Sequence, residues 1–194
     1  KEQLPEADAI FGNGDLSQID KTVRSVMRGN RPVVKPKQLG VCCGTRNEFL
    51  SFKGSAFVKI TEGCNNFCSF CAIPVIRGEL RSRPAEEIIA EIKQLVKSGV
   101  YEINLIGQDL AAYGCGKTDC IFKDGIDWYS VTYEDLPADS KMKLAAAKKS
   151  SPLCSLMKKI SALKGNFVVR LLYIHPDHFN KDILPVMQKD KRFP

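Results

Sequence analysis

Predicted strands and helices alternate through most of the chain. Three short apolar runs have the length and composition of buried strands, and three further segments have the pattern of helices. The predicted strands are residues 57–62, 100–106 and 167–174, and the predicted helices are residues 84–98, 153–163 and about 180–189. This alternation predicts an α/β fold in which a parallel sheet is connected by crossover helices. Because the strands are almost continuously apolar, we expect both faces of the sheet to be covered.

The helix predicted at residues 84–98 has clear signals at both ends. Pro84 suits the first helical position, and Gly99 can end the helix in a left-handed conformation. An apolar stripe runs along one side of this helix, at Ile88, Ile92, Leu95 and Val96. We expect that side to pack on the sheet.

The first part of the chain has a different pattern. An apolar run at residues 7–11 predicts a strand, and a helix is expected from Asp15 or Ser17 to about Met27. Residues 30–53 contain prolines and glycines without a clear period, which indicates a linker between domains. The chain starts without Met and stops soon after a helix-like segment, so we interpret it as a fragment of a longer protein.

The chemically distinctive residues follow the predicted strands. Cys64 comes after the first strand, Gln108 and Asp109 follow the second, and His175 follows the third. In (β/α) barrels the carboxyl ends of the strands carry the chemistry. Three such units make half of a barrel or more, so the sequence predicts a partial (β/α) barrel with parallel strands.

Three cysteines lie within eight residues, at Cys64, Cys68 and Cys71. A 4Fe–4S cluster normally takes four thiolates, so three local ligands would leave one iron open to a substrate. S-adenosylmethionine can chelate such an iron, and Phe67 and Phe70 are placed to limit solvent access. Two other interpretations stay open, each with a distant fourth ligand: a structural zinc site, or an ordinary electron-transfer cluster.

The composition limits the role of the cysteines, the location and the kind of partner. The chain has eight cysteines, and without a signal peptide or an apolar run of membrane-spanning length, metal binding or catalysis is favoured over disulfides. We expect a cytoplasmic location. The net charge of +7 fits a nucleic-acid or ribosome partner, and equally an ordinary solvated surface.

The cysteine segment resembles the radical SAM superfamily, in which C-x3-C-x-aromatic-C follows the first barrel strand. The matching residues here are Cys64, Cys68, Phe70 and Cys71. The surrounding sequence is similar to the methylthiotransferase family within it. That similarity lies in residues 62–65, 73–74, 77–78, 81–84, 107–109 and 112–114.

Two branches of that family are candidates. Gln108-Asp109, residues 169–173 and residues 4–15 resemble the branch that modifies an aspartate of a small-subunit ribosomal protein. His175-Pro176 is shared with the branch that modifies isopentenyl-adenosine in transfer RNA. The resemblance therefore implies methylthiolation of the aspartate β-carbon, with transfer RNA modification as the alternative.

The resemblance also implies an organisation and a set of cofactors. Residues 1–29 would be the tail of an α/β N-terminal methylthiotransferase domain, and residues 54–194 a truncated radical SAM core with an insertion at about 115–151. The cofactors would be a 4Fe–4S cluster that cleaves S-adenosylmethionine to a 5′-deoxyadenosyl radical, and a second 4Fe–4S cluster in the full-length protein. The partners would be the ribosomal protein or ribosome and an electron donor such as flavodoxin or ferredoxin, with no membrane.

Four residues are implied as cofactor-binding: Glu62, Gln108, Asp109 and Arg170. Gln108 and Asp109 occupy positions that contact the amino group and ribose of the cofactor, although Asp109 also suits the cap of the following turn. Arg170 is a charge within an apolar strand and must be paired if buried. Its partner would be the cofactor carboxylate or a barrel carboxylate such as Glu62.

Other polar residues have weaker signals. Arg77, Arg81 and Arg83 follow the cysteines and would face substrate, cofactor or solvent, whereas His175 shapes a turn beside Pro176. Cys42 and Cys43 are interpreted as linker thiols. A further metal site formed by Cys115, Cys120 and Cys154 is an alternative for the insertion, which also carries a basic segment at 141–149.

Overall fold

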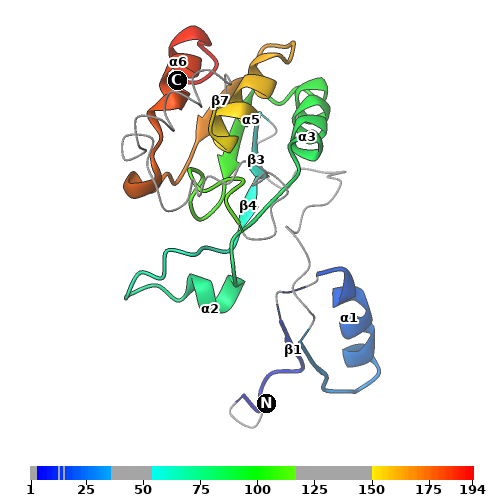
Figure 1. Cartoon of the computed structure of the whole chain (residues 1–194). Coiled ribbons are helices and arrows are strands. Elements are labelled where there is room, and N and C mark those ends of the chain that lie inside the picture. Colours follow the sequence, from blue (N-terminus) through cyan, green and yellow to red (C-terminus); the bar gives the residue numbers. More distant parts are fainter. Residues whose placement is uncertain (1–3, 13, 15, 36–53, 117–149) are drawn as a thin grey trace.

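The structure is a computed structural model that describes residues 4–12, 14, 16–35, 54–116 and 150–194 (Figure 1). The described residues form an N-terminal part, up to residue 35, and a larger part from residue 54 onward, and each is considered by itself. Within them no helix is long and apolar enough to cross a bilayer.

The N-terminal part is a small strand–helix–strand unit. Strand β1 (Ile10–Phe11) pairs in parallel with β2 (Val33–Val34), and η1 (Leu16–Gln18) and α1 (Ile19–Met27) connect them. The predicted linker is therefore structured at its start, since Val33 and Val34 are β-branched residues that extend a parallel pair. The remaining residues of that linker, 36–53, lie outside the described residues, with Cys42 and Cys43.

The larger part is built on a parallel three-stranded sheet, as predicted. The strands are β3 (Ser55–Lys59), β6 (Glu102–Ile106) and β7 (Val168–Leu171), in the order β3–β6–β7. The helices are α3 (Ala85–Lys97), α5 (Pro152–Ser161) and α6 (Leu184–Lys189), with short 3-10 turns η3 (Pro176–His178) and η4 (Lys181–Ile183). Because all three strands are parallel, their carboxyl ends lie at one edge of the sheet.

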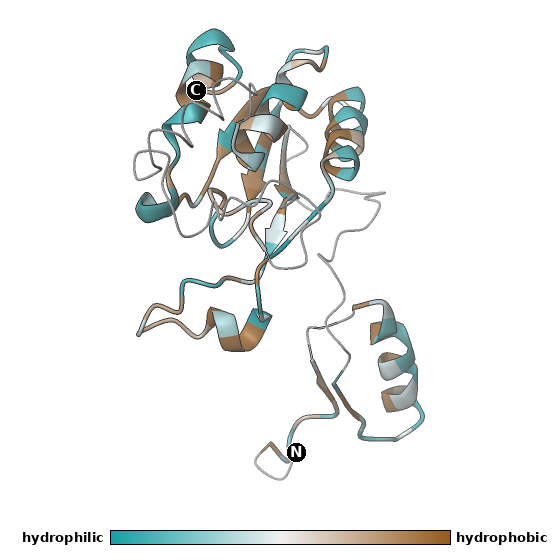
Figure 2. Cartoon of the chain, in the orientation of Figure 1, coloured by the Kyte–Doolittle hydropathy of each residue, from teal (hydrophilic) through white to brown (hydrophobic). Residues whose placement is uncertain are grey.

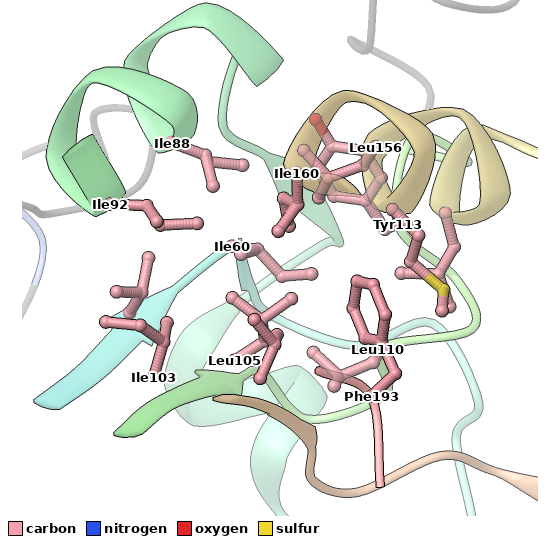
Figure 3. Packing of buried hydrophobic residues seen from close by; sticks show 14 of the residues in the cluster. Ile60, Ile88, Ile92, Ile103, Leu105, Leu110, Tyr113, Leu156, Ile160 and Phe193 are labelled. Atoms are coloured by element: carbon pink, nitrogen blue, oxygen red, sulfur yellow. The ribbon is translucent and has the colours of Figure 1, made fainter. Parts of the chain in front are cut away.

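Helices pack on one face of this sheet and enclose the core (Figure 3). Alternate strand residues point into it, and Figure 2 shows brown, apolar segments of strand and helix facing each other there. The fully buried members from the strands and helices include Val58, Ile60, Ile103, Leu105, Ile88, Ile92, Met157 and Ile160. Each such side chain contributes about 1.5–3 kcal/mol on burial, so this layer dominates the stability of the domain.

The opposite face of the sheet carries a polar cluster around Asn104, which is only 4% exposed. Asn104 Nδ2 donates to Ser55 Oγ and to Glu102 Oε1, both at 3.0 Å. Arg170 Nε lies 3.0 Å from Glu102 Oε2. These side chains form a hydrogen-bonded polar cluster on the face opposite the core, beside the apolar Phe57 and Ile106.

The first predicted strand is divided. The β3 ladder ends where Ile60 N donates to Ile106 O, and Thr61–Glu62 (β4) then pairs antiparallel with Arg81–Ser82 (β5). A short helix, α2 (Ile73–Arg77), lies between β4 and β5 and was not predicted. The prediction of one strand over 57–62 is wrong because β4 leaves the main sheet for a local pairing.

Helix α3 confirms the predicted stripe. Ile88, Ile92 and Leu95 are buried, and Gly99 has φ +89°. Pro84 is the N-cap rather than the first helical residue, because its ψ of 136° is extended. The helix consequently begins at Ala85.

Candidate functional site

A loop of residues 63–80, here called the cysteine loop, follows β4 just beyond the carboxyl end of β3 and carries α2 (Figure 1). Its base is closed by backbone contacts, since Cys64 N donates to Gly78 O at 3.2 Å. Gly63 has φ +78°, and a Cβ there would lie 2.2 Å from Glu79 O. Only glycine satisfies both the left-handed backbone and this close approach.

Side-chain contacts also hold the base of the cysteine loop together. Asn65 Oδ1 accepts from Leu80 N at 2.9 Å. The buried Glu62 carboxylate accepts from Arg77 Nη1 and from Lys59 Nζ, each at 2.8 Å. Glu62 therefore connects the start of the cysteine loop to the end of α2, and its partner is not Arg170.

The three predicted ligands lie together on this loop. Cys64, Cys68 and Cys71 are free thiols of intermediate burial, and Cys71 N donates to Cys68 O at 2.9 Å. Burial raises the pKa of Cys64, the Asn66 N–H opposes this, and the nearby Asp109, Cys68 and Cys71 add to the rise. Asp109 and the three thiols therefore share one electrostatic environment, in which a bound cation would favour the thiolates.

The donor set fits an iron–sulfur cluster. Among the described residues, no three His, Cys, Asp or Glu side chains converge on one point as the ligands of a single ion do. A tetrahedral zinc site requires such convergence, whereas a 4Fe–4S cluster takes one thiolate on each of several irons. Three free thiols on one short loop are the ligand type of such a cluster.

The exposure of the two aromatic residues of the loop differs from the prediction that they limit solvent access. Phe67 is 70% exposed and Phe70 is 90% exposed, so neither shields the thiols in this structure. Phe67 also has φ 45°, a left-handed conformation that is uncommon outside glycine. The loop extends away from the core, which explains the exposure (Figure 1).

A pocket of about 560 Å³ lies at the carboxyl edge of the sheet. It is lined by Phe57, Lys59, Thr61, Glu62, Arg77, Ile106, Gly107, Gln108 and Tyr173. The Thr61 hydroxyl is buried and has no hydrogen-bond partner among the described residues, which fits a site for a polar ligand. Thr61 was missed from the sequence because a threonine in a strand carries no distinctive signal.

Two of the four predicted cofactor residues, Glu62 and Gln108, line this pocket. Arg170 does not, because it pairs with Glu102 at the amino end of β6. Its side chain is 54% exposed, so the premise of a buried charge was wrong. The geometry therefore supports a structural ion pair between Arg170 and Glu102.

Asp109 is almost fully buried and its carboxylate is already occupied. Oδ1 accepts from Ala111 N and from His175 N, both at 3.1 Å, and Oδ2 lies 2.5 Å from His178 Nδ1. The turn-capping interpretation is therefore confirmed. His178 was missed, and its signal was its position three residues beyond His175 at the end of a strand.

The other candidate residues have structural partners. Arg83 is buried and donates to Glu91 Oε2 at 2.6 Å, and Arg81 donates to the carbonyls of Arg77 and Glu79. His175 accepts from Asp177 N through Nδ1, as expected of a residue that shapes a turn. Arg81 thus connects the base of the loop, and Arg83 joins it to α3.

The remaining thiols do not form a second site in the described residues. Cys115 is buried beside Leu80 and Ala112, whereas Cys154 belongs to the main core. Burial raises the pKa of Cys154, as expected of an inert core thiol. Cys120 and the basic segment 141–149 lie outside the described residues.

Comparison with known proteins identifies the family. Residues 58–193 match the profile of the radical SAM superfamily. A protein named ribosomal protein uS12 methylthiotransferase RimO, from Treponema denticola, is 49% identical over 200 residues, which cover 100% of this chain and 38% of that protein. Proteins of the same name from Syntrophomonas wolfei and Dictyoglomus thermophilum are 32% and 43% identical, covering 98% and 66% of this chain and 37% and 22% of theirs. The chain thus spans well under half of the length of these curated relatives. The chain belongs to the radical SAM superfamily, and its cofactors are a 4Fe–4S cluster and S-adenosylmethionine.

Proposed function

We propose that this chain is the cluster-binding part of a methylthiotransferase that modifies an aspartate of ribosomal protein uS12. The observation that carries the proposal is the cysteine loop beside a polar pocket at the carboxyl edge of the sheet. The 49% identity to the Treponema protein named RimO supports the choice of substrate. Residues 54–194 form the core domain in this proposal.

Cys64, Cys68 and Cys71 are the proposed cluster ligands. When bound, the cluster supplies the electron that cleaves the sulfonium of S-adenosylmethionine. The chain fixes the spacing of the three thiols through Gly63 and the Glu62–Arg77 pair at the base of the loop. Without these contacts, ordering the loop around the cluster would cost more conformational entropy.

The pocket is the proposed site of S-adenosylmethionine. This cofactor presents an ammonium, a carboxylate, ribose hydroxyls and an adenine ring. Gln108 and Glu62 offer acceptors, Lys59 and Arg77 offer cations, and the unpartnered Thr61 hydroxyl offers one more polar contact. Asp109 and Arg170 are left out of this set because their side chains are used elsewhere.

Several properties of the whole protein follow from the same proposal. The substrate is uS12 or the ribosome that contains it, and the net charge of +7 favours association with a ribonucleoprotein. The location is cytoplasmic, and an electron donor such as flavodoxin or ferredoxin supplies the reducing equivalent. A second 4Fe–4S cluster would belong to the part of the protein outside this chain.

The test uses full-length protein, reconstituted without oxygen. It is incubated with S-adenosylmethionine, reductant and either uS12 or unmodified transfer RNA. We expect a tryptic uS12 peptide to gain the mass of one methylthio group on aspartate, and the nucleosides to stay unchanged. Modified adenosine with unmodified uS12 would instead establish the transfer RNA alternative.

Variants assign the chemistry to the cysteine loop. Cys64→Ala, Cys68→Ala and Cys71→Ala should each abolish modification and lower bound iron. Cys154→Ala is the matched control, because it removes a thiol from the core and leaves the loop intact. An equal loss of iron in the control would show that the thiols act only through folding.

Electron paramagnetic resonance separates the non-enzyme alternatives. The reduced protein should give a 4Fe–4S signal that changes when S-adenosylmethionine is added. A cluster signal that ignores the cofactor would indicate an electron carrier. One equivalent of zinc and no cluster signal would indicate a structural metal site.

A further inference from the structure

We propose that Asp109 and His178 are positioning residues that hold Tyr173 at the mouth of the pocket, where its ring contacts the bound cofactor. The inference rests on the proposed function, because it takes the pocket to be the S-adenosylmethionine site. It assigns a role to three residues outside the cysteine loop.

Tyr173 has an unusual conformation in a prominent place. Its φ is 69°, in the left-handed region that aromatic residues rarely adopt, and it lies two residues beyond the end of β7. Tyr173 is 68% exposed and lines the pocket together with Gln108. A strained residue at the edge of a site persists only when its surroundings fix it.

The surroundings of Tyr173 are fixed by two consecutive residues after β6. Leu110 N donates to Tyr173 O at 3.0 Å, and the Leu110 side chain is completely buried. Asp109 then accepts from His175 N at 3.1 Å and contacts His178 Nδ1 at 2.5 Å. These three contacts bind Tyr173 and the residues that follow it to the end of the neighbouring strand.

The Asp109 carboxylate is suited to positioning rather than to ligand contact. Asp109 is 2% exposed, and its two oxygens are taken by two backbone N–H groups and the His178 ring. The His178 side chain is itself only 11% exposed. A ligand in the pocket would therefore meet Tyr173 and Gln108, while Asp109 and His178 stay behind them.

The contact is separate from the base of the cysteine loop. The Glu62–Arg77 pair and the close approach at Gly63 hold that base, and neither contact involves residues 173–178. Loss of the Asp109–His178 contact should release Tyr173 and weaken cofactor binding. It should leave the bound cluster in place.

The experiment compares His178 and Tyr173 variants of the reconstituted full-length protein. His178→Leu removes the contact, and His178→Asn keeps a side-chain N–H near the position of Nδ1. Tyr173→Gly removes the ring while favouring the same positive φ. The readouts are hydrogen exchange of the peptide spanning residues 172–179 without S-adenosylmethionine, iron content, and the dissociation constant for S-adenosylmethionine.

His178→Leu should accelerate exchange in that peptide and weaken binding about tenfold, with iron content unchanged. His178→Asn should restore much of the wild-type protection from exchange and much of the wild-type affinity. Tyr173→Gly should weaken binding by a similar factor, and the double variant His178→Leu/Tyr173→Gly should lose no more than either single variant, because His178 acts through Tyr173.

Three results would overturn the inference: unchanged affinity in His178→Leu, additive losses in the double variant, or loss of iron in His178→Leu. Wild-type protein that binds no S-adenosylmethionine would overturn the proposed function along with it. Normal wild-type binding with an unaffected His178→Leu variant would overturn this inference alone.

Discussion

Glu62 Oε1 lies 2.8 Å from Arg77 Nη1, so an ion pair joins the residue before the cysteine loop to the end of α2. The Glu62 side chain is 8% exposed and Arg77 is 34% exposed. Lys59 contacts the other carboxylate oxygen at 2.8 Å. This arrangement connects β3, which is part of the rigid sheet, to the loop that carries the proposed ligands.

Replacing Glu62 by Gln should loosen the loop. We expect the free energy of unfolding to fall by about 1 kcal/mol. The decrease is small because Arg77 is partly exposed, so water replaces part of the broken ion pair. Release of iron to a chelator should be faster than in the wild type. Glu86→Gln is the matched control, since Glu86 pairs with Lys159 on the exposed surface and should leave the release rate unchanged.

Replacing Gly63 by Ala should open the base of the loop. The new Cβ would lie 2.2 Å from Glu79 O at a residue with φ +78°, so both packing and backbone oppose it. Iron bound after reconstitution should fall well below that of the wild type.

Gly99→Ala separates these two effects. Gly99 has φ +89°, yet nothing lies within 4 Å of a Cβ placed there. This variant should cost about 1 kcal/mol of unfolding free energy through backbone strain alone and should keep its iron. Equal iron loss in both variants would mean that strain, not the close approach at the loop, controls cluster binding.

The sequence predicted those features that depend on local patterns. The stripe Ile88, Ile92 and Leu95 placed α3 correctly because amphipathic spacing is a property of one segment. The division of 57–62 into β3 and β4 was not predictable in the same way. It depends on the pairing of Glu62 with Arg81, which lies far along the chain.

The same distinction applies to the site. Cys64, Cys68 and Cys71 form a local pattern, and the structure keeps them on one loop. The cap that Asp109 forms on the following turn was predicted locally, but Asp109 and His178 are 69 residues apart, so no local pattern revealed their contact. Arg170 pairs with Glu102 on the adjacent strand, a contact that no local pattern predicted.

The Asp190–Arg192 pair predicts a stability change at acidic pH. Arg192 holds the pKa of Asp190 at about 2, below its ordinary 3.8, and also donates to the carbonyls of Ser161 and Leu163 at the end of α5. Because the folded pKa is lowered, the pair stabilises the protein fully above 3.8 and progressively less as the pH falls towards 2.

Asp190→Asn should therefore lower the melting temperature at neutral pH. The difference from the wild type should shrink as the pH falls through that window, because the wild-type carboxylate becomes protonated. A difference that stays constant with pH would show that the variant acts through packing rather than through charge.

Gln108 and Arg170 provide a direct comparison of two predicted cofactor residues. Gln108 lines the pocket, whereas Arg170 pairs with Glu102 at the amino end of β6. Gln108→Ala should weaken S-adenosylmethionine binding about tenfold through the loss of a hydrogen-bonding side chain. Arg170→Gln should leave the dissociation constant unchanged, since the Arg170 side chain is 54% exposed and reaches a different part of the sheet. Titration calorimetry on the reconstituted full-length protein measures both, and weaker binding in Arg170→Gln would place the cofactor across the polar face of the sheet instead of at its carboxyl edge.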